Sequence, residues 1–197
     1  MSPLEQSLSR IAHDLRGRGQ RFAVVGGLAV SARAEPRLTR DADLVVVAPD
    51  DASVEQLVRD LGEGGYEMKL LVEEEATGRI ATVRLAHPLD AGVVVDLLFA
   101  SSGIEDEIVA HAEELQLTAE LALPVGTAGH LIATKLLARD DRHRPADADD
   151  LRALAEVADD VDWSVAADAV ALIAERGYSR GRDLDAALRE LRTSGAY

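Results

Sequence analysis

Two neighbouring stretches decide the fold: FAVVGGLAVSA at residues 22–32 and TRDADLVVV at residues 39–47. The first predicts a short buried strand, a glycine turn and a helix, because apolar residues lead into the glycines and a helix-forming run follows. In the second, Asp41 and Asp43 precede an apolar run that is typical of a buried strand. Residues at i and i+2 of a strand point to the same face. The pattern therefore predicts a tight glycine turn beside a pair of carboxylates.

This pairing of glycines and acids suits phosphate and metal chemistry. Gly26 and Gly27 let the backbone approach a phosphate, which the N–H groups at the start of the next helix can bind. Two like charges side by side are costly unless a cation neutralises them, and Mg²⁺ with oxygen ligands is the usual cation. A third acid, Asp96, lies in a further predicted strand at residues 93–99. The alternative is that these acids are strand-edge surface residues and a polar break in a core strand.

In this order, the glycine pair, the Asp-x-Asp and the later Asp96 resemble the nucleotidyltransferases of the DNA-polymerase-β superfamily. The resemblance implies that Asp41, Asp43 and Asp96 hold two Mg²⁺ ions and that a nucleoside triphosphate (NTP) is the substrate. It also implies binding of the β- and γ-phosphates by the glycine backbone. Asp96 is the expected general base by its position.

Composition limits the classes of function. The chain has 197 residues, 36 of them acidic and 21 basic, and a net charge of −15. This charge argues against broad, non-specific nucleic-acid binding but leaves room for a local basic patch. Because there is no cysteine, a disulfide framework and a thiolate metal site are excluded, and the five scattered histidines do not predict zinc. No apolar run has transmembrane length and no signal pattern is visible, so we expect a cytoplasmic protein without a membrane partner.

The predicted elements place the chain in the α/β (α+β) class. Residues 1–102 are expected to form a nucleotidyltransferase core with a mixed sheet, and residues 103–197 a helical bundle that completes the active site. Helices are predicted at 3–18, 28–33 and 50–61, and strands at 22–25, 44–47, 69–72, 80–85 and 93–99. After residue 102 we expect a helix at 104–114, an extended link at 120–125, and helices at 127–139, 146–157, 163–176 and 184–191.

The second half of the chain contributes a lysine and two acids. Lys135 lies in an otherwise apolar helix, and a buried ammonium group needs a partner, which could be a triphosphate or a carboxylate. Asp147 and Asp150 are three residues apart and share a helix face. Such a pair can orient Lys135 or act on the nucleophile. The alternatives are a lysine that reaches solvent and acids favoured at a helix start by the dipole.

These residues narrow the resemblance to the AbiEii/MenT group of toxin nucleotidyltransferases, over roughly residues 22–155. The matching residues are Gly26, Gly27, Ala29, Arg37, Thr39, Asp41, Asp43, Lys135, Asp147, Asp150 and Leu151. The resemblance implies that Lys135 binds nucleotide phosphates, aided by Arg37 or Arg40. It further implies transfer of nucleotides to the tRNA 3′ end and restraint by a cognate antitoxin protein.

Other functions stay open at this point. A small-molecule hydroxyl, such as that of a cationic antibiotic, is an alternative acceptor that the acidic charge favours. A non-catalytic, antitoxin-like binding module is a third possibility. Thr39 also suggests a switch, because phosphorylation two residues before Asp41 would add negative charge beside the metal acids and compete with nucleotide.

Overall fold

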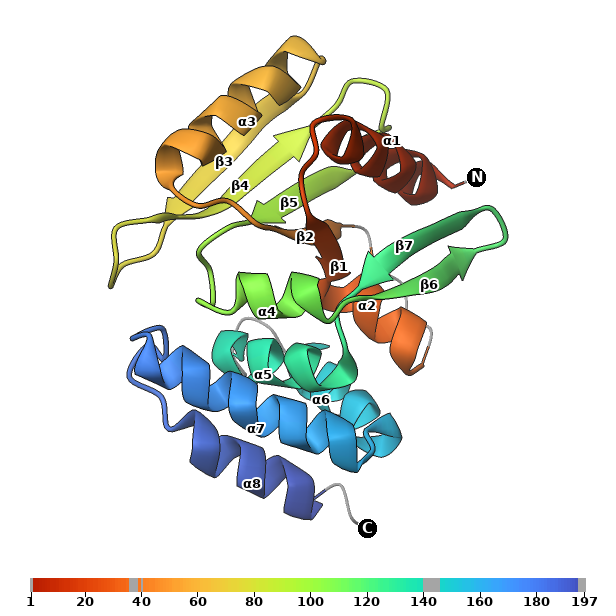
Figure 1. Cartoon of the computed structure of the whole chain (residues 1–197). Helices are drawn as coiled ribbons and strands as arrows, with labels where there is room; N and C mark the ends of the chain where they lie inside the picture. Colours follow the sequence, from red (N-terminus) through yellow and green to blue (C-terminus); the bar gives the residue numbers. More distant parts are fainter. Residues whose placement is uncertain (1, 36–38, 40, 140–145, 195–197) are drawn as a thin grey trace.

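The computed structural model of the chain describes residues 2–35, 39, 41–139 and 146–194 (Figure 1). The described residues form one seven-stranded mixed sheet and eight helices. Helices dominate the C-terminal part, and in Figure 1 α5 to α8 pack together on one side of the molecule, away from α1 and α3. The predicted α/β class with a helical C-terminal region is confirmed.

The sheet has the strand order β3-β4-β5-β2-β1-β7-β6. Its central strands β1, β2 and β5 are short and apolar, as expected for strands covered on both faces. β2 runs antiparallel to β1 and parallel to β5. In the parallel pair, Asp43 of β2 lies directly beside Asp96 of β5. The strand bounds are β1 Phe22–Val25, β2 Ala42–Val46, β3 Glu67–Glu73, β4 Ile80–Ala86, β5 Val94–Leu98, β6 Glu113–Thr118 and β7 Leu121–Val125.

Several helices begin at side-chain caps that satisfy otherwise unpaired N–H groups. Ser2 and Glu5 form a capping box at the start of α1, and Thr127 accepts a hydrogen bond from the His130 N–H at the start of α5. The helix bounds are α1 Pro3–Gly17, α2 Gly26–Arg33, α3 Asp51–Glu63, α4 Glu105–Ala110, α5 Ala128–Ala138, α6 Ala146–Val157, α7 Asp160–Glu175 and α8 Leu184–Ser194. No helix among the described residues is long and apolar enough to cross a membrane.

One sequence prediction is corrected. The helix expected at 104–114 ends at Ala110, and residues 113–118 form β6, which pairs with β7 as an antiparallel hairpin. Leu115 and Leu117 alternate with polar residues, which is the period of a strand, and both pack against the core. The sheet therefore continues past residue 102 to Val125, while the division into two domains near that residue stays a prediction.

Helix α2 is the element that joins the sheet to the C-terminal helices. It follows β1 directly and contacts α5 and α6 as well as β2. Helix α5 is buried along most of its length, and α7 approaches it so closely that a Cβ on Gly129 would lie 2.4 Å from the Asp162 carbonyl oxygen. This packing fixes Lys135 of α5 above the glycine turn of α2.

Candidate active site

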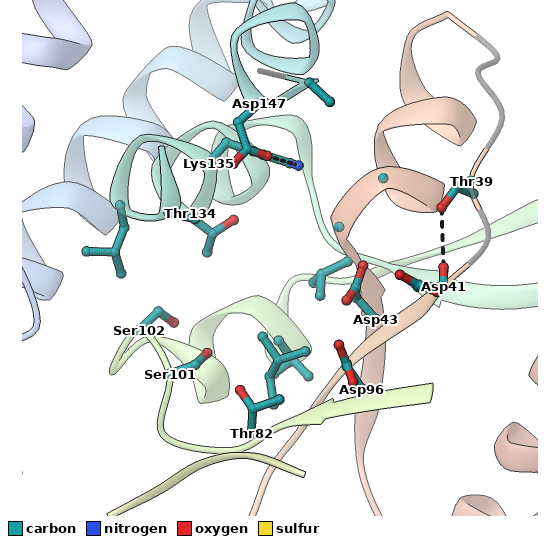
Figure 2. Close-up of a pocket in the computed structure, with 18 of the residues that line it drawn as sticks. Thr39, Asp41, Asp43, Thr82, Asp96, Ser101, Ser102, Thr134, Lys135 and Asp147 are labelled. Carbon is teal, nitrogen blue, oxygen red and sulfur yellow. Dashed lines mark hydrogen bonds and ion pairs between the residues drawn. The ribbon is translucent and has the colours of Figure 1, made fainter. Parts of the chain in front are cut away.

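A cavity of about 560 Å³ lies between the sheet and the C-terminal helices. Glycines, carboxylates, hydroxyls and two cationic side chains line it. Figure 2 shows the carboxylates, the hydroxyls and Lys135 around it. Most of the residues predicted from the sequence are found here: Gly26, Gly27, Thr39, Asp41, Asp43, Asp96, Lys135 and Asp147. Segments more than one hundred residues apart in the chain thus contribute to one site.

The sheet register brings the acids together. Asp43 of β2 is the direct partner of Asp96 on the parallel strand β5 and of Val25 on β1. Asp41 immediately precedes β2, and the Thr39 hydroxyl donates a hydrogen bond of 3.3 Å to the Asp41 carbonyl oxygen (Figure 2). All three carboxylates line the cavity, and in Figure 2 they lie on the same side of it. Switching of the site by phosphorylation of Thr39 stays a prediction.

Gly26 is required where it stands. Its φ of +65° is a left-handed conformation that side chains disfavour, and a Cβ there would lie 2.0 Å from Oδ2 of Asp43. Helix α2 begins at this residue, and its N-cap, Val25, makes no side-chain hydrogen bond to the first turn. The N–H groups at the start of α2 therefore face the cavity without a side-chain cap, as a phosphate-binding turn requires.

Lys135 is held by two buried carboxylates from α6. Its Nζ lies 2.7 Å from Oδ1 of Asp147 and 2.6 Å from Oδ2 of Asp150, and its side chain is only 13% exposed. An ammonium group has three donors, so one remains for the cavity that Lys135 lines. The sequence predicted either a carboxylate or a triphosphate as the partner of Lys135. The structure shows carboxylates, and the third donor of the ammonium group leaves room for a phosphate as well. Asp150 lies behind Lys135 rather than in the cavity lining.

Asp147 keeps one oxygen for a further partner. Oδ1 accepts the hydrogen bond from Lys135, while Oδ2 is buried and has no hydrogen-bond donor among the described residues. A buried carboxylate oxygen without a donor is costly. Asp147 lines the cavity, so a rotation of its carboxylate would bring this buried oxygen within reach of a hydroxyl or amino group of a bound molecule.

Arg84 is a site residue that the sequence prediction missed. Its Nε and one terminal nitrogen donate to the two oxygens of Asp96, at 2.7 and 2.6 Å. Together with the charges of Asp41 and Asp43, this pairing raises the pKa of Arg84 above its ordinary value, although partial burial opposes the shift. The predicted turn at residues 87–92 could have indicated this pair. Arg84 and Asp96 lie six residues before and after Asp90, so a hairpin centred on Asp90 places them opposite one another.

A second cation of the site, Arg180, comes from the connection between α7 and α8. One of its terminal nitrogens donates to Oε2 of buried Glu74 at 2.9 Å and to the Ser101 carbonyl oxygen at 2.8 Å. Arg180 adopts a φ of +53°, which non-glycine residues seldom do, and it lines the cavity. Hydroxyl groups complete this wall, from Thr82, Ser101, Ser102 and Thr134 (Figure 2). Nothing in the sequence pattern indicated their proximity.

The carboxylates form a suitable donor set for a divalent cation. Asp41, Asp43 and Asp96 present only oxygen ligands at one wall of the cavity, which suits Mg²⁺. Among the described residues, however, no three such side chains converge closely enough to form a ready-made metal site. Arg84 supplies part of the reason, because it already neutralises Asp96. Arg37 and Arg40, predicted to contact phosphate, lie outside the described residues.

Comparison with solved structures supports the fold. An antigenic nucleotidyltransferase-like protein from Paracoccidioides brasiliensis aligns with a TM-score of 0.54 and 18% identity, over 94% of this chain and 92% of its own. The lincosamide antibiotic adenylyltransferase LnuA aligns at 0.49 and 13% identity, over 78% and 98%. MenT4, a nucleotidyltransferase toxin from Mycobacterium tuberculosis H37Rv, aligns at 0.32 and 17% identity, over 87% and 85%.

Comparison with sequences gives the family. No curated protein matches the chain significantly. A family model described as the nucleotidyl transferase AbiEii toxin of type IV toxin–antitoxin systems matches residues 11–196. The match includes every element of the cavity, from the glycine turn to the α7–α8 connection. The chain therefore belongs to the AbiEii family of nucleotidyltransferase toxins.

Proposed function

We propose that this protein transfers a nucleoside monophosphate from an NTP to the 3′ end of an RNA, with tRNA as the acceptor, in a reaction that depends on Mg²⁺. As the toxin of a toxin–antitoxin pair, it would block translation until its antitoxin restrains it. The family supplies the reaction type, nucleotidyl transfer, and the toxin–antitoxin setting. The metal, the acceptor and the roles of single residues are the proposed part.

The observation that carries the proposal is the position of Asp43. Its carboxylate lies against the Gly26 backbone and beside Asp96 in the sheet register. A phosphate bound at the glycine turn would therefore lie next to the carboxylates. A triphosphate and its cation need this combination, because the cation bridges phosphate oxygens to acidic side chains.

The transfer reaction is a displacement at the α-phosphorus of the NTP. The acceptor 3′ oxygen forms a bond to this phosphorus, the bond from phosphorus to the bridging oxygen of the β-phosphate breaks, and pyrophosphate leaves. When bound, Mg²⁺ would make the acceptor hydroxyl more acidic and stabilise the leaving group. Asp41, Asp43 and Asp96 would hold it.

The remaining residues act directly on the NTP and the hydroxyl proton. Lys135 has a donor left for phosphate oxygens, and Asp147, once its carboxylate rotates to expose Oδ2, would accept a hydrogen bond from a ribose hydroxyl. Asp96 stays the proposed base for the hydroxyl proton. Arg84 donates one hydrogen bond to each oxygen of Asp96, and each oxygen keeps a second lone pair that can accept the proton.

A small cationic molecule is the second candidate acceptor. The net charge of −15 favours it, since an acidic surface attracts cations and repels a polyanion. The family membership favours RNA. The two candidates share the transfer step and differ only in the source of the attacking hydroxyl.

A transfer assay separates them. Purified protein would be incubated with Mg²⁺, each α-³²P-labelled NTP in turn and total tRNA, with Asp41→Ala as the matched inactive control. Label on tRNA with the wild type alone supports the proposal. If the wild type binds Mg-NTP but labels no RNA, the RNA acceptor is refuted and an aminoglycoside or lincosamide becomes the next acceptor to test.

A further inference from the structure

The edge strand β3 is open on both of its faces. Four apolar side chains are exposed along it: Met68 (54%), Leu70 (48%), Leu71 (40%) and Val72 (43%). A run of exposed apolar residues on an edge strand is unusual, because it invites association. The strand is therefore a candidate contact surface, and its two faces differ in what lies beside them.

The register divides these four residues into two pairs. Directly opposed residues of an antiparallel pair share a face. Leu70 pairs with Arg84 and Val72 with Thr82, whereas Met68 pairs with Leu85 and Leu71 with Val83, which are core residues. A register shift between Met68 and Leu70 produces this division. Leu70 and Val72 thus lie on the face that carries the active site, and Met68 and Leu71 on the opposite face.

The active-site face is continuous from β3 to the carboxylates. Arg84 bridges it, because it stands between Leu70 on one side and Asp96 on the other. Thr82 lines the catalytic cavity itself. Leu70 is two strands from Asp96, or about 10 Å at the usual strand spacing. We call the surface of Leu70, Val72, Thr82 and Arg84 the β3–β4 shelf.

We propose that the β3–β4 shelf binds the unpaired 3′-terminal nucleotides of the acceptor RNA and delivers the terminal hydroxyl to Asp96. This inference rests on the proposed function and identifies the acceptor side of the site. The apolar surface of Leu70 and Val72 would take the face of a base, and the Thr82 hydroxyl can hydrogen-bond to a base edge or a sugar.

Arg84 supplies the cation for a phosphodiester on this shelf. Its guanidinium group is charged at any working pH. Its pair with Asp96 is partly exposed to solvent, so a phosphate can approach the guanidinium from the open side. The net charge of −15 works against a polyanion, and Arg84 is itself paired with Asp96, so we assign the hold on the acceptor end mainly to Leu70, Val72 and Thr82, with the guanidinium as the cationic contact of the shelf.

The two faces of β3 provide a matched test. Leu70→Ala with Val72→Ala removes apolar surface on the active-site face, and Met68→Ala with Leu71→Ala removes similar surface on the other. The Michaelis constants for a short RNA with an unpaired 3′ end and for NTP would be measured for both variants and the wild type. Fluorescence anisotropy of the 5′-labelled RNA would give binding without turnover, and thermal unfolding would confirm that each variant is folded.

We expect the Leu70/Val72 variant to weaken RNA binding by about fivefold to thirtyfold, as loss of apolar contact area does, with the KM for NTP unchanged. The Met68/Leu71 variant should match the wild type. Equal RNA binding by both variants, while the wild type still labels RNA, would overturn the shelf and leave the proposed function intact. Weaker inhibition by the antitoxin with unchanged RNA binding would instead make the shelf a protein-docking surface. A wild type that neither binds nor labels RNA would overturn both proposals.

Discussion

Replacement of Lys135 by methionine tests whether this lysine is structural, catalytic or both. Methionine keeps the length of the side chain and removes the charge. Asp147 and Asp150 are both nearly fully buried and lose their shared ammonium partner in this variant. Removing one partner of a buried ion pair costs about 3–5 kcal/mol, because a buried charge is left uncompensated.

In a domain of this size, each kcal/mol lowers the melting temperature by about 2–4 °C, so we expect a fall of roughly 6–20 °C. Differential scanning calorimetry at neutral pH measures it. The chain contains only one other lysine, Lys69, which is exposed and paired with Glu67 on β3. Lys69→Met is therefore a matched control and should change the melting temperature little, since exposed ion pairs contribute about 0–1 kcal/mol.

A triple variant separates stability from chemistry. Adding Asp147→Asn and Asp150→Asn to Lys135→Met removes the two buried carboxylate charges that faced the ammonium group and should recover much of the lost stability. Nucleotidyl transfer should stay absent, because the ammonium group proposed to bind phosphate is gone. Melting of Lys135→Met at the temperature of the Lys69 control would refute the buried cluster. Wild-type transfer by the triple variant would refute the role of Lys135 at phosphate.

Three further perturbations address the rest of the site. Gly26→Ala should abolish transfer and destabilise the fold, because the new Cβ would meet Asp43 Oδ2 at 2.0 Å in a left-handed backbone conformation; unchanged transfer would contradict this. Asp41→Asn should abolish transfer but leave the circular dichroism spectrum and melting temperature nearly unchanged, since Asp41 is exposed; residual transfer near the wild-type rate would count against a role in metal binding. Burial, and to a smaller extent the nearby His111, lowers the pKa of His130 from 6.5 to about 4. Between these two pH values the unfolded chain binds more protons than the folded chain. The free energy of unfolding should therefore rise with pH across that window, by up to about 3 kcal/mol. His130→Asn should flatten this rise in denaturation curves recorded between pH 4.5 and 7.5, and an unchanged slope would exclude His130 as its source.

Local patterns were sufficient to predict most of the fold. The strand, glycine turn and helix at residues 22–32 occur as expected, because apolar runs and glycines specify them without long-range help. The hairpin of β6 and β7 was not predicted. Its strands lie at the other edge of the sheet, and β6 is largely exposed, so only the alternation of Leu115 and Leu117 with polar residues indicated it.

The part of the candidate site that was predictable consists of short motifs, the glycine pair and the Asp-x-Asp, whose residues are close together in the sequence. The position of Asp96 beside Asp43 follows from a parallel pair between β2 and β5, which the chain order alone does not specify. Arg84 and Arg180 escaped prediction for a physical reason. Arg84 meets Asp96 through the register of the β4–β5 hairpin, which its turn at residues 87–92 indicated but did not specify, whereas Arg180 meets Glu74 through the placement of a distant loop that no local pattern indicated.

The central claim is that the chain adds nucleotides to an RNA 3′ end. Its most direct test is mass spectrometry of a defined tRNA after incubation with the protein, Mg²⁺ and the four NTPs, followed by nuclease mapping of the added mass. We expect a mass increase of one or more nucleotide residues located at the 3′ terminus, and none with Asp41→Ala. An unchanged tRNA mass in the presence of protein that consumes NTP and transfers the monophosphate to a small molecule would contradict it.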